Sequence, residues 1–462
     1  LDVLYSFYFD YQVNYAVGIR TLGEYNLAER TWNYFRARIY NYSIENPKGC
    51  DLLFEQFINL LHVFTGKTGS SLDEQRTDTT LFMSNIKKSG RISLAYDVLV
   101  QAVKAIPEEN RTNALSESLE PNFKTDILHK TRNQDGDSKL SQLLNLCSEA
   151  LKILEEHPDM LDSEVAQITR RFLTEQTISD EQSEKLVPKP NKEISSDSLQ
   201  SAYDTDATYR KKGKVAQSGY VLEISETCSK ENDVQFITDY AVEPNIVSDV
   251  EILAGRLEEI KDNTNCTKMY LDGGFHSDDV YEAAEKAGIE IHLTNMSGTE
   301  PSKKLPVTEF EIDPETNVIS KCPKGYIPVR TNINASQTTA HFPHEACENC
   351  ELRDQCYSVE QSKLCIVRIP LNSIKVSQQR EEMKAHRKEN TSKRAAIEGT
   401  NSALKRKGQD KLDVRGIVKS TMVSGLKVAA QNIKRLIKYT QGGYKPKSKN
   451  IPHQGETVPN FN

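Results

Sequence analysis

The stretch Met269–Ser277, MYLDGGFHS, predicts how the rest of the chain is arranged. Its first three residues are typical of the end of a buried strand, and Asp272 follows directly. Two glycines then allow the backbone to turn sharply, and a helical pattern begins at Asp278. A carboxylate at the tip of a central strand lies where α/β sheets bind their ligands. The alternative interpretation is that Asp272 only caps the next helix.

The segments around this stretch alternate between strand and helix patterns. Residues 219–224 alternate apolar and polar side chains, as a half-buried strand does, and further strand patterns cover 234–242, 268–271 and 289–293. Amphipathic helix patterns cover 247–260 and 278–287. A hairpin followed by alternating helices and strands predicts an α/β fold with a mixed sheet and flanking helices.

Working outward from this core, the patterns divide the chain into seven segments. We expect an N-terminal helical region at 1–70, and the chain starts with Leu1 inside an amphipathic pattern, which indicates a truncated N-terminus. The other predicted segments are a first core strand at 71–84, a helical insertion at 85–200, the mixed-sheet core at 201–300, a Cys-rich insertion at 301–370, basic C-terminal helices at 371–440 and a flexible tail at 441–462.

The distribution of charge is more informative than its sum. The formal net charge of the 462-residue chain is −7, which is unusual for a protein that binds nucleic acid. However, acidic residues dominate roughly 105–200, whereas Lys and Arg dominate from about Lys363 to Lys449. A local basic stretch can bind phosphates even when the whole chain is acidic. There is no signal-peptide pattern and no apolar run long enough to span a bilayer.

Four of the nine cysteines cluster in one short region of the sequence. Cys347 and Cys350 have CxxC spacing, Cys356 follows closely, and Cys322 begins a CPKG turn. Four thiolates at such spacing suit a structural, tetrahedral Zn²⁺. His344 and Cys365 are alternative ligands. The alternative interpretations are a set of buried reduced cysteines and an iron–sulfur cluster.

Three carboxylates far apart in the sequence could form a second metal site. Asp78 lies in a strand pattern, QRTDTTLFMS, and Asp272 follows another strand. Glu398 lies on a basic helix, with Arg394 one turn before it and Lys405 about two turns after it. Clustered carboxylates suit Mg²⁺ or Mn²⁺, and two such ions can drive in-line displacement at phosphorus. The alternative is an ordinary salt-bridged helix surface.

Four stretches resemble bacterial DDE transposases of insertion sequences, in the branch with a Cys-rich segment (insertion-sequence family 1182). They are RTDTTLFMSNI at 76–86, YDTDATYRKKGK with GYV at 203–221, MYLDGGFHS at 269–277 and RAAIEGTNSALK at 394–405. The last is similar to a signature in which Arg precedes Glu and Lys follows it. The tyrosine that usually precedes this arginine is replaced by Thr391.

The resemblance implies an RNase H-like domain that cleaves and transfers DNA strands with Mg²⁺ or Mn²⁺ held by Asp78, Asp272 and Glu398. It leaves Asp206, or the nearby Asp204, as an alternative to Asp78 as the first of the three catalytic acids in the sequence. It also implies a cytoplasmic, nucleoid-associated bacterial protein that binds terminal repeats and target DNA as a homodimer, without a membrane. The residues expected to contact DNA are Arg394, Lys405, Arg406, Lys434 and Arg435. The alternative function is an inactive transposase relic that acts only as a zinc-containing DNA-binding protein.

Overall fold

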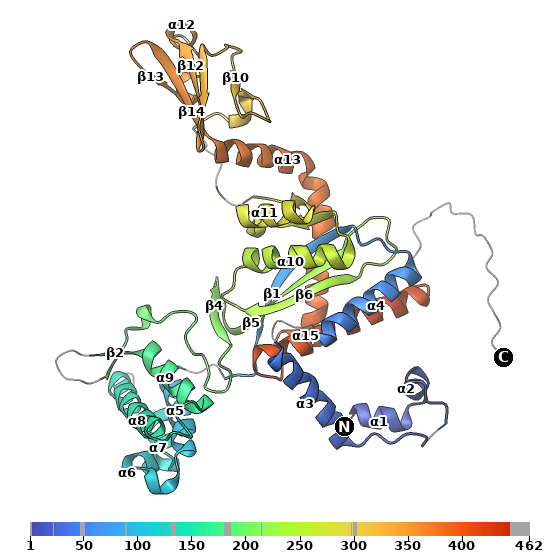
Figure 1. Ribbon diagram of the computed structural model, residues 1–462, viewed down its shortest axis with the longest axis vertical. Coiled ribbons are helices and arrows are strands. Elements are labelled where there is room, and N and C mark those ends of the chain that lie inside the picture. The colour runs from blue at the N-terminus through green and yellow to red at the C-terminus, as the bar shows by residue number, and fades with distance from the viewer. Residues whose placement is uncertain are drawn as a thin grey trace.

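The computed structural model describes residues 2–21, 23–46, 51–87, 90–130, 135–179, 186–213, 215–296, 298 and 303–443. Figure 1 shows a central sheet with helices packed on it, a helical unit to one side, and a smaller sheet at the far end of helix α13. The prediction of an α/β fold with a mixed sheet and flanking helices is confirmed.

The central sheet places β1 (Glu74–Met83) in its middle. Its strand order is β4-β5-β1-β7-β8, and β6 also pairs with β5. β1 is antiparallel to β5 and parallel to β7, and β7 is parallel to β8. The other strands are β4 (Thr208–Lys212), β5 (Val215–Thr227), β6 (Ile237–Pro244), β7 (Lys268–Leu271) and β8 (Glu290–Leu293).

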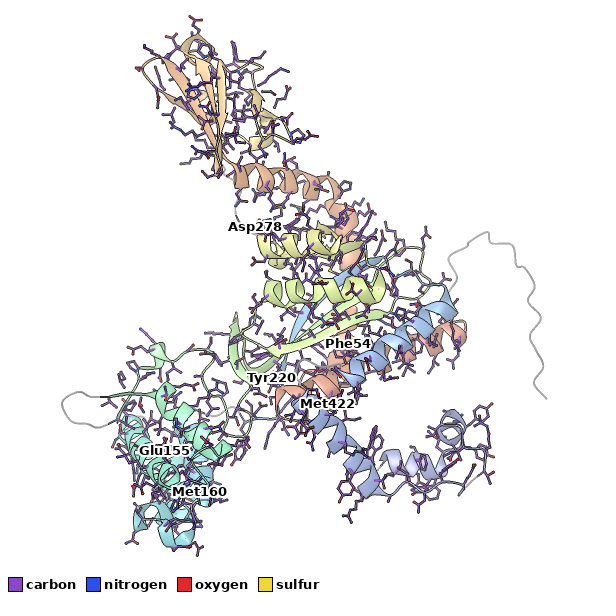
Figure 2. The ribbon with its side chains drawn as sticks, in the orientation of Figure 1. Phe54, Glu155, Met160, Tyr220, Asp278 and Met422 are labelled. Carbon is purple, nitrogen blue, oxygen red and sulfur yellow. The ribbon has the colours of Figure 1, made fainter. Side chains whose placement is uncertain are left out.

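Helices pack on this sheet and form two separate apolar cores with it. On one side, α10 (Asp249–Thr264) and α11 (Asp278–Ala287) bury Leu253 and Val280 against Met269 of β7. On the other side, a second core joins β5 and β6 to helices α4 (Leu52–Thr68), α14 (Ile397–Leu404) and α15 (Ile417–Thr440). Figure 2 labels Phe54, Tyr220 and Met422 on α4, β5 and α15. Alternate strand residues face opposite sides, so each strand contributes to both layers.

A helical unit with its own core lies between β1 and β4 in the sequence. It contains α5 (Arg91–Ala105), α6 (Asn113–Glu117), α7 (Pro121–Leu128), α8 (Gly136–Glu156) and α9 (Glu164–Gln176), followed by the hairpin β2 (Thr177–Ser179) and β3 (Leu186–Pro188). Its apolar residues, such as Leu99, Leu144 and Phe172, form one buried cluster. Figure 1 shows this unit beside the sheet, and Figure 2 labels Glu155 and Met160 within it.

The remaining elements lie at the two ends of the molecule. The N-terminal helices are α1 (Asp2–Phe9), α2 (Tyr11–Ala16) and α3 (Glu29–Glu45). The Cys-rich region forms the hairpin β9 (Glu311–Ile312) and β10 (Ile319–Lys321). It also contains a four-stranded sheet of β11 (Arg330–Ile333), β12 (Gln337–Pro343), β13 (Ser358–Glu360) and β14 (Leu364–Pro370), together with the short helix α12 (His344–Cys347).

The basic C-terminal region is helical but interrupted. α13 (Leu371–Arg394) leads into α14, and a π-helical turn then covers Lys405–Gln409, where Gly408 has a φ of 81°. This turn directs the chain back along the end of β1 before α15 begins. Of the expected tail at 441–462, residues from 444 onward lie outside the described part of the chain. Among the described helices, none combines the length and apolar character that crossing a bilayer requires.

We expect Gly219→Ala to destabilise the protein. Gly219 pairs with Met83 and has a φ of 155°, and an added Cβ would lie 2.4 Å from the carbonyl oxygen of Phe82 and 2.8 Å from the amide nitrogen of Ser84. Because backbone atoms cannot move aside freely, we expect the free energy of unfolding to fall by about 1–3 kcal/mol. Urea denaturation measures this change.

Gly255→Ala is the matched control, because the space around Gly255 in α10 is open in the described structure. Alanine favours the helix interior, so we expect this control to gain up to about 1 kcal/mol. Equal stability of the two variants would contradict the close approach of β5 and β1 at Gly219.

Candidate functional site

Asp78 lies in the middle of β1, on the face of the sheet toward α13 and α14. Arg76, Asp78 and Thr80 share this face because side chains alternate along a strand. The Asp78 side chain is 16% exposed, and one of its oxygens accepts a hydrogen bond of 3.0 Å from the side-chain amide of Asn401 on α14. A carboxylate in the central strand therefore reaches a partly open surface instead of the apolar core.

Asp272 follows β7, the parallel neighbour of β1. The register pairs Arg76 with Tyr270, so the next residues on the same face of the two strands are Asp78 and Asp272. Asp272 Oδ1 accepts a hydrogen bond of 2.8 Å from the backbone N–H of Gly274. At Gly273 a Cβ would lie 2.8 Å from Asn295 Oδ1, so a larger residue there would displace the Asn295 side chain. The parallel register and this turn together place the second carboxylate beside the first.

Arg394 joins the two aspartates to Glu398. Its Nη2 lies 3.2 Å from Asp78 Oδ1 and 3.3 Å from Asp272 Oδ2, and its Nη1 lies 3.3 Å from Glu398 Oε1. Arg394 ends α13 and Glu398 begins α14, at the (i, i+4) spacing that places two side chains on one helical face. Three carboxylates from three separate elements thus converge on one guanidinium.

The site carries more negative than positive charge. Burial raises the pKa of Asp78 above its usual value, the Arg394 guanidinium opposes this shift, and the Asp272 carboxylate adds to it. Three carboxylates around one guanidinium leave an excess of negative charge that a further cation can offset. Exposure increases from Asp78 and Arg394, both 16%, to Asp272 at 37% and Glu398 at 67%, so the cluster opens toward solvent on the Glu398 side.

A buried ion-pair network holds the helices that carry this cluster. Glu226 on β5 is fully buried, and its carboxylate contacts Arg76 at 2.7 Å and Arg435 of α15 at 2.9 Å. Thr400 of α14 donates a further hydrogen bond of 2.8 Å to the same carboxylate. Arg76 also donates to the backbone carbonyl of Lys393, next to Arg394. One carboxylate therefore fixes the ends of α13, α14 and α15 relative to the sheet.

The alternative first acids lie elsewhere. Asp206 Oδ2 accepts a hydrogen bond of 2.9 Å from the backbone N–H of Ile417, at the start of α15. Asp204 is buried and accepts hydrogen bonds from Ser84 and from the hydroxyl of Tyr220. The structure brings Asp78, and neither of these two, into contact with the arginine that Asp272 and Glu398 share.

The basic residues expected to contact DNA divide into two groups. Arg406 and Lys434 are exposed and Lys405 is half-buried, all on the C-terminal helical segments. Arg394 and Arg435 instead contact carboxylates, as described above. The guanidinium of Arg435 therefore stabilises the packing of α15 on the sheet.

The sequence patterns did not indicate four residues that shape the site. Asn401 lies three residues after Glu398 on α14, a helical spacing that could have indicated a side chain on the same face. Glu226 and Arg76 gave no such signal, because an ion pair between two strands depends on which strands are neighbours. The side chain of Asn295 accepts a hydrogen bond of 2.6 Å from the N–H of Gly273, and this contact likewise depends on the tertiary arrangement.

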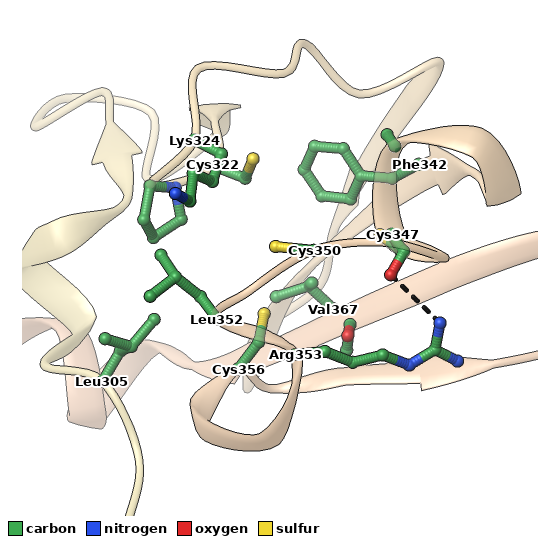
Figure 3. A pocket seen from close by; sticks show the side chains of 13 residues that line it. Leu305, Cys322, Lys324, Phe342, Cys347, Cys350, Leu352, Arg353, Cys356 and Val367 are labelled. Carbon is green, nitrogen blue, oxygen red and sulfur yellow. Dashed lines mark hydrogen bonds between the residues drawn. The ribbon is translucent and has the colours of Figure 1, made fainter.

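The four clustered cysteines line one small cavity in the Cys-rich region. Cys322, Cys347, Cys350 and Cys356 surround a space of about 20 Å³, close to the volume of one water molecule or ion. Figure 3 shows them with Leu305, Leu352, Phe342 and Val367 around them. Burial, with the neighbouring thiols of Cys365, Cys356 and Cys322 contributing, raises the pKa of Cys347 to about 12.

Neither cluster is arranged as a ready-made metal site. Within the described ranges, no group of three or more His, Cys, Asp or Glu side chains is positioned to hold an ion. For the acids, the Arg394 guanidinium lies among the three carboxylates and supplies the positive charge itself. For the cysteines, the expected zinc site gains no support from the structure and stays a prediction.

Comparison with known proteins relates the C-terminal part of the chain to a protein family. Residues 321–437 match the family model described as "Transposase DDE domain". The matched segment contains Arg394, Glu398 and all four clustered cysteines, whereas Asp78 and Asp272 lie before it. Enzymes of this family transfer phosphoryl groups, and such a domain implies transposase function and DNA binding. Searches of curated proteins and of solved structures each found no match.

We expect Glu226→Gln to destabilise the protein strongly. The substitution keeps the shape of the side chain but removes the buried charge that the guanidinium groups of Arg76 and Arg435 share. Removing one partner of a buried ion pair costs about 3–5 kcal/mol. Guanidinium chloride denaturation measures the loss.

Glu258→Gln is the control, since Glu258 forms an exposed ion pair with Lys286 and should contribute less than about 1 kcal/mol. If Glu226→Gln were as stable as this control, the network would not be what holds the helices in place.

Proposed function

We propose that this protein is a DNA transposase that cleaves DNA at the ends of an insertion sequence and joins those ends to target DNA. The observation that carries the proposal is the convergence of Asp78, Asp272 and Glu398 on one guanidinium. The transposase DDE domain matched at residues 321–437 contributes the third of these acids. We therefore assign them as the catalytic carboxylates.

An RNase H-like core is the finer description of the sheet that we propose. It rests on the DDE match and is supported by the order β6-β5-β1-β7-β8, in which three antiparallel strands are followed by two parallel ones. Asp78 on the central strand and Asp272 at the end of its parallel neighbour then lie where α/β sheets bind ligands. Membership of insertion-sequence family 1182 and a homodimer on paired DNA ends stay predictions.

Divalent cations, Mg²⁺ or Mn²⁺, are the cofactors that this set of donors suits. Carboxylate oxygens are hard ligands, and the excess negative charge of the cluster favours a cation of higher charge. Asp78, Asp272 and Glu398 would hold the ions. When bound, such ions activate the attacking oxygen and stabilise the leaving oxygen in an in-line displacement at phosphorus.

The residues of the chain position this chemistry. Asn401 and the Gly274 N–H each hold one carboxylate oxygen, which fixes the direction in which the other oxygens point. The Arg394 guanidinium offsets repulsion between the acids, and its planar donors also suit a phosphate of bound DNA. If Arg394 exchanged its contacts with the three carboxylates for contacts with a DNA phosphate, the carboxylates would become free to bind cations only when DNA is present. Lys405, Arg406 and Lys434 would add phosphate contacts along the helices.

We expect Asp272→Asn to slow metal-dependent DNA cleavage severely while leaving DNA binding intact. The amide cannot carry the negative charge that an ion needs, and metal catalysis supplies several kcal/mol of stabilisation, so cleavage should slow by about a thousandfold. Nicking of DNA that carries the terminal repeats, with Mg²⁺, measures the rate, and fluorescence anisotropy without metal measures binding.

Asp278→Asn is the control, since Asp278 is an exposed residue at the start of α11 that pairs with Lys375 (Figure 2). It should cleave as the unmodified protein does. Cleavage by Asp272→Asn at the control rate would refute the assignment. DNA binding without cleavage by the unmodified protein would favour the inactive relic.

A further inference from the structure

A cationic cavity lies at the end of β1, beyond the catalytic cluster. It has a volume of about 520 Å³, and its lining residues are Met83, Asn85, Ile86, Lys87, Lys411 and Arg415. Three of these six carry a positive charge, and all three are exposed. We refer to it as the β1-end cavity.

Hydrogen bonds fix both walls of the β1-end cavity to the strand that carries Asp78. The N–H of Met83 donates to the carbonyl of Asp410 at 2.9 Å, and the N–H of Leu412 donates back to the carbonyl of Met83 at 3.1 Å. The N–H of Asn85 then donates to the carbonyl of Val414 at 3.2 Å. The segment after the π-helical turn therefore pairs alongside the end of β1, and its cations keep a set position relative to the catalytic acids.

The charged residues that line the β1-end cavity are all cations, which favours an anion. Asp410 and Asp413 are exposed on the same segment, but neither lines the cavity. Asp97 of α5 is close enough to Lys87 to interact with its charge. Arg415 donates a hydrogen bond of 2.9 Å to the carbonyl of Asn85, and its guanidinium lies 5.2 Å from the ring centre of the exposed Tyr203. Cations beside an exposed aromatic ring are typical of surfaces that bind nucleic acid.

We propose that the β1-end cavity binds backbone phosphates of the DNA that occupies the catalytic site. This inference rests on the proposed function and adds to it the surface along which DNA leaves the acids. At about 3.3 Å per strand residue, the end of β1 lies about 17 Å from Asp78. That length corresponds to about five base pairs at 3.4 Å each. Phosphate contacts of this kind position DNA without reading its sequence.

The exposure of the lysines at the β1-end cavity supports DNA over a small phosphate compound as the ligand. Lys87 and Lys411 are exposed point charges on long side chains, which suit the repeated charges of a backbone. The cavity also lies near the junction between the sheet and the helical unit, because Lys87 interacts with the charge of Asp97 on α5. A duplex lying across this junction would contact both parts of the protein.

The test measures the salt dependence of DNA binding by the double variant Lys87→Ala/Lys411→Ala. With a DNA duplex longer than the predicted path and no divalent metal, we expect the slope of log K against log salt to fall by about 1.8, since each lost phosphate contact removes about 0.9. Affinity at about 0.1 M salt should fall at least tenfold by the same relation. Inorganic phosphate at millimolar concentration should not compete with DNA.

The matched control is Lys152→Ala/Lys286→Ala, which removes the same charge from exposed lysines of α8 and α11. It should keep the slope of the unmodified protein. An unchanged slope in the Lys87/Lys411 variant, or an equal fall in the control, would overturn the proposal. Strong competition by inorganic phosphate would also overturn it in favour of a small-anion site.

The result is independent of the proposed catalysis, because binding is measured without metal. If Asp272→Asn still cleaved DNA while the Lys87/Lys411 variant lost its salt slope, the catalytic assignment would fail and the DNA path would stand. The reverse pattern would leave the catalytic acids in place and remove the β1-end cavity from the DNA path.

Discussion

The arrangement of the site depends on the contact between Arg394 and three carboxylates. Asp78, Asp272 and Glu398 would repel one another if they met without a positive charge between them. The guanidinium offsets this repulsion, and its forked geometry allows contacts to three oxygens at 3.2–3.3 Å. The same contact holds the end of α13 against β1 and β7, so the fold of the C-terminal helices and the chemistry of the site are linked.

Because of this link, the buried carboxylate of Glu226 supports both the packing of the C-terminal helices and the geometry of the site. Glu226 pairs with Arg76 beneath the site and with Arg435 of α15, and it accepts a hydrogen bond from Thr400. The network positions α14 so that Glu398 faces Arg394 while remaining largely exposed. A cluster that is rigid at its base and open at Glu398 can exchange a protein cation for metal ions and DNA. The β1-end cavity extends the same rigid frame along β1.

Local sequence patterns predicted much of the fold but not the contacts between distant segments. The alternating pattern of 219–224 predicted a strand, and the structure shows a longer one, β5. The stretch MYLDGGFHS predicted a strand end, a turn and a helix, and all three are observed. The periodicity of 371–440 predicted helices but not the π-helical turn at Gly408, because that turn depends on packing against the end of β1. The sequence also left Asp78 and Asp206 as alternatives, since strand order alone decides which of them is beside Asp272.

The most direct test of the account is Mn²⁺ binding, measured by electron paramagnetic resonance in the presence of uncleavable DNA. If the three carboxylates form the metal site, the protein binds Mn²⁺, and the variant Asp78→Asn/Asp272→Asn loses that binding while Asp206→Asn keeps it. Equal Mn²⁺ binding by the protein and the Asp78/Asp272 variant would contradict the central claim that these acids converge to hold catalytic cations.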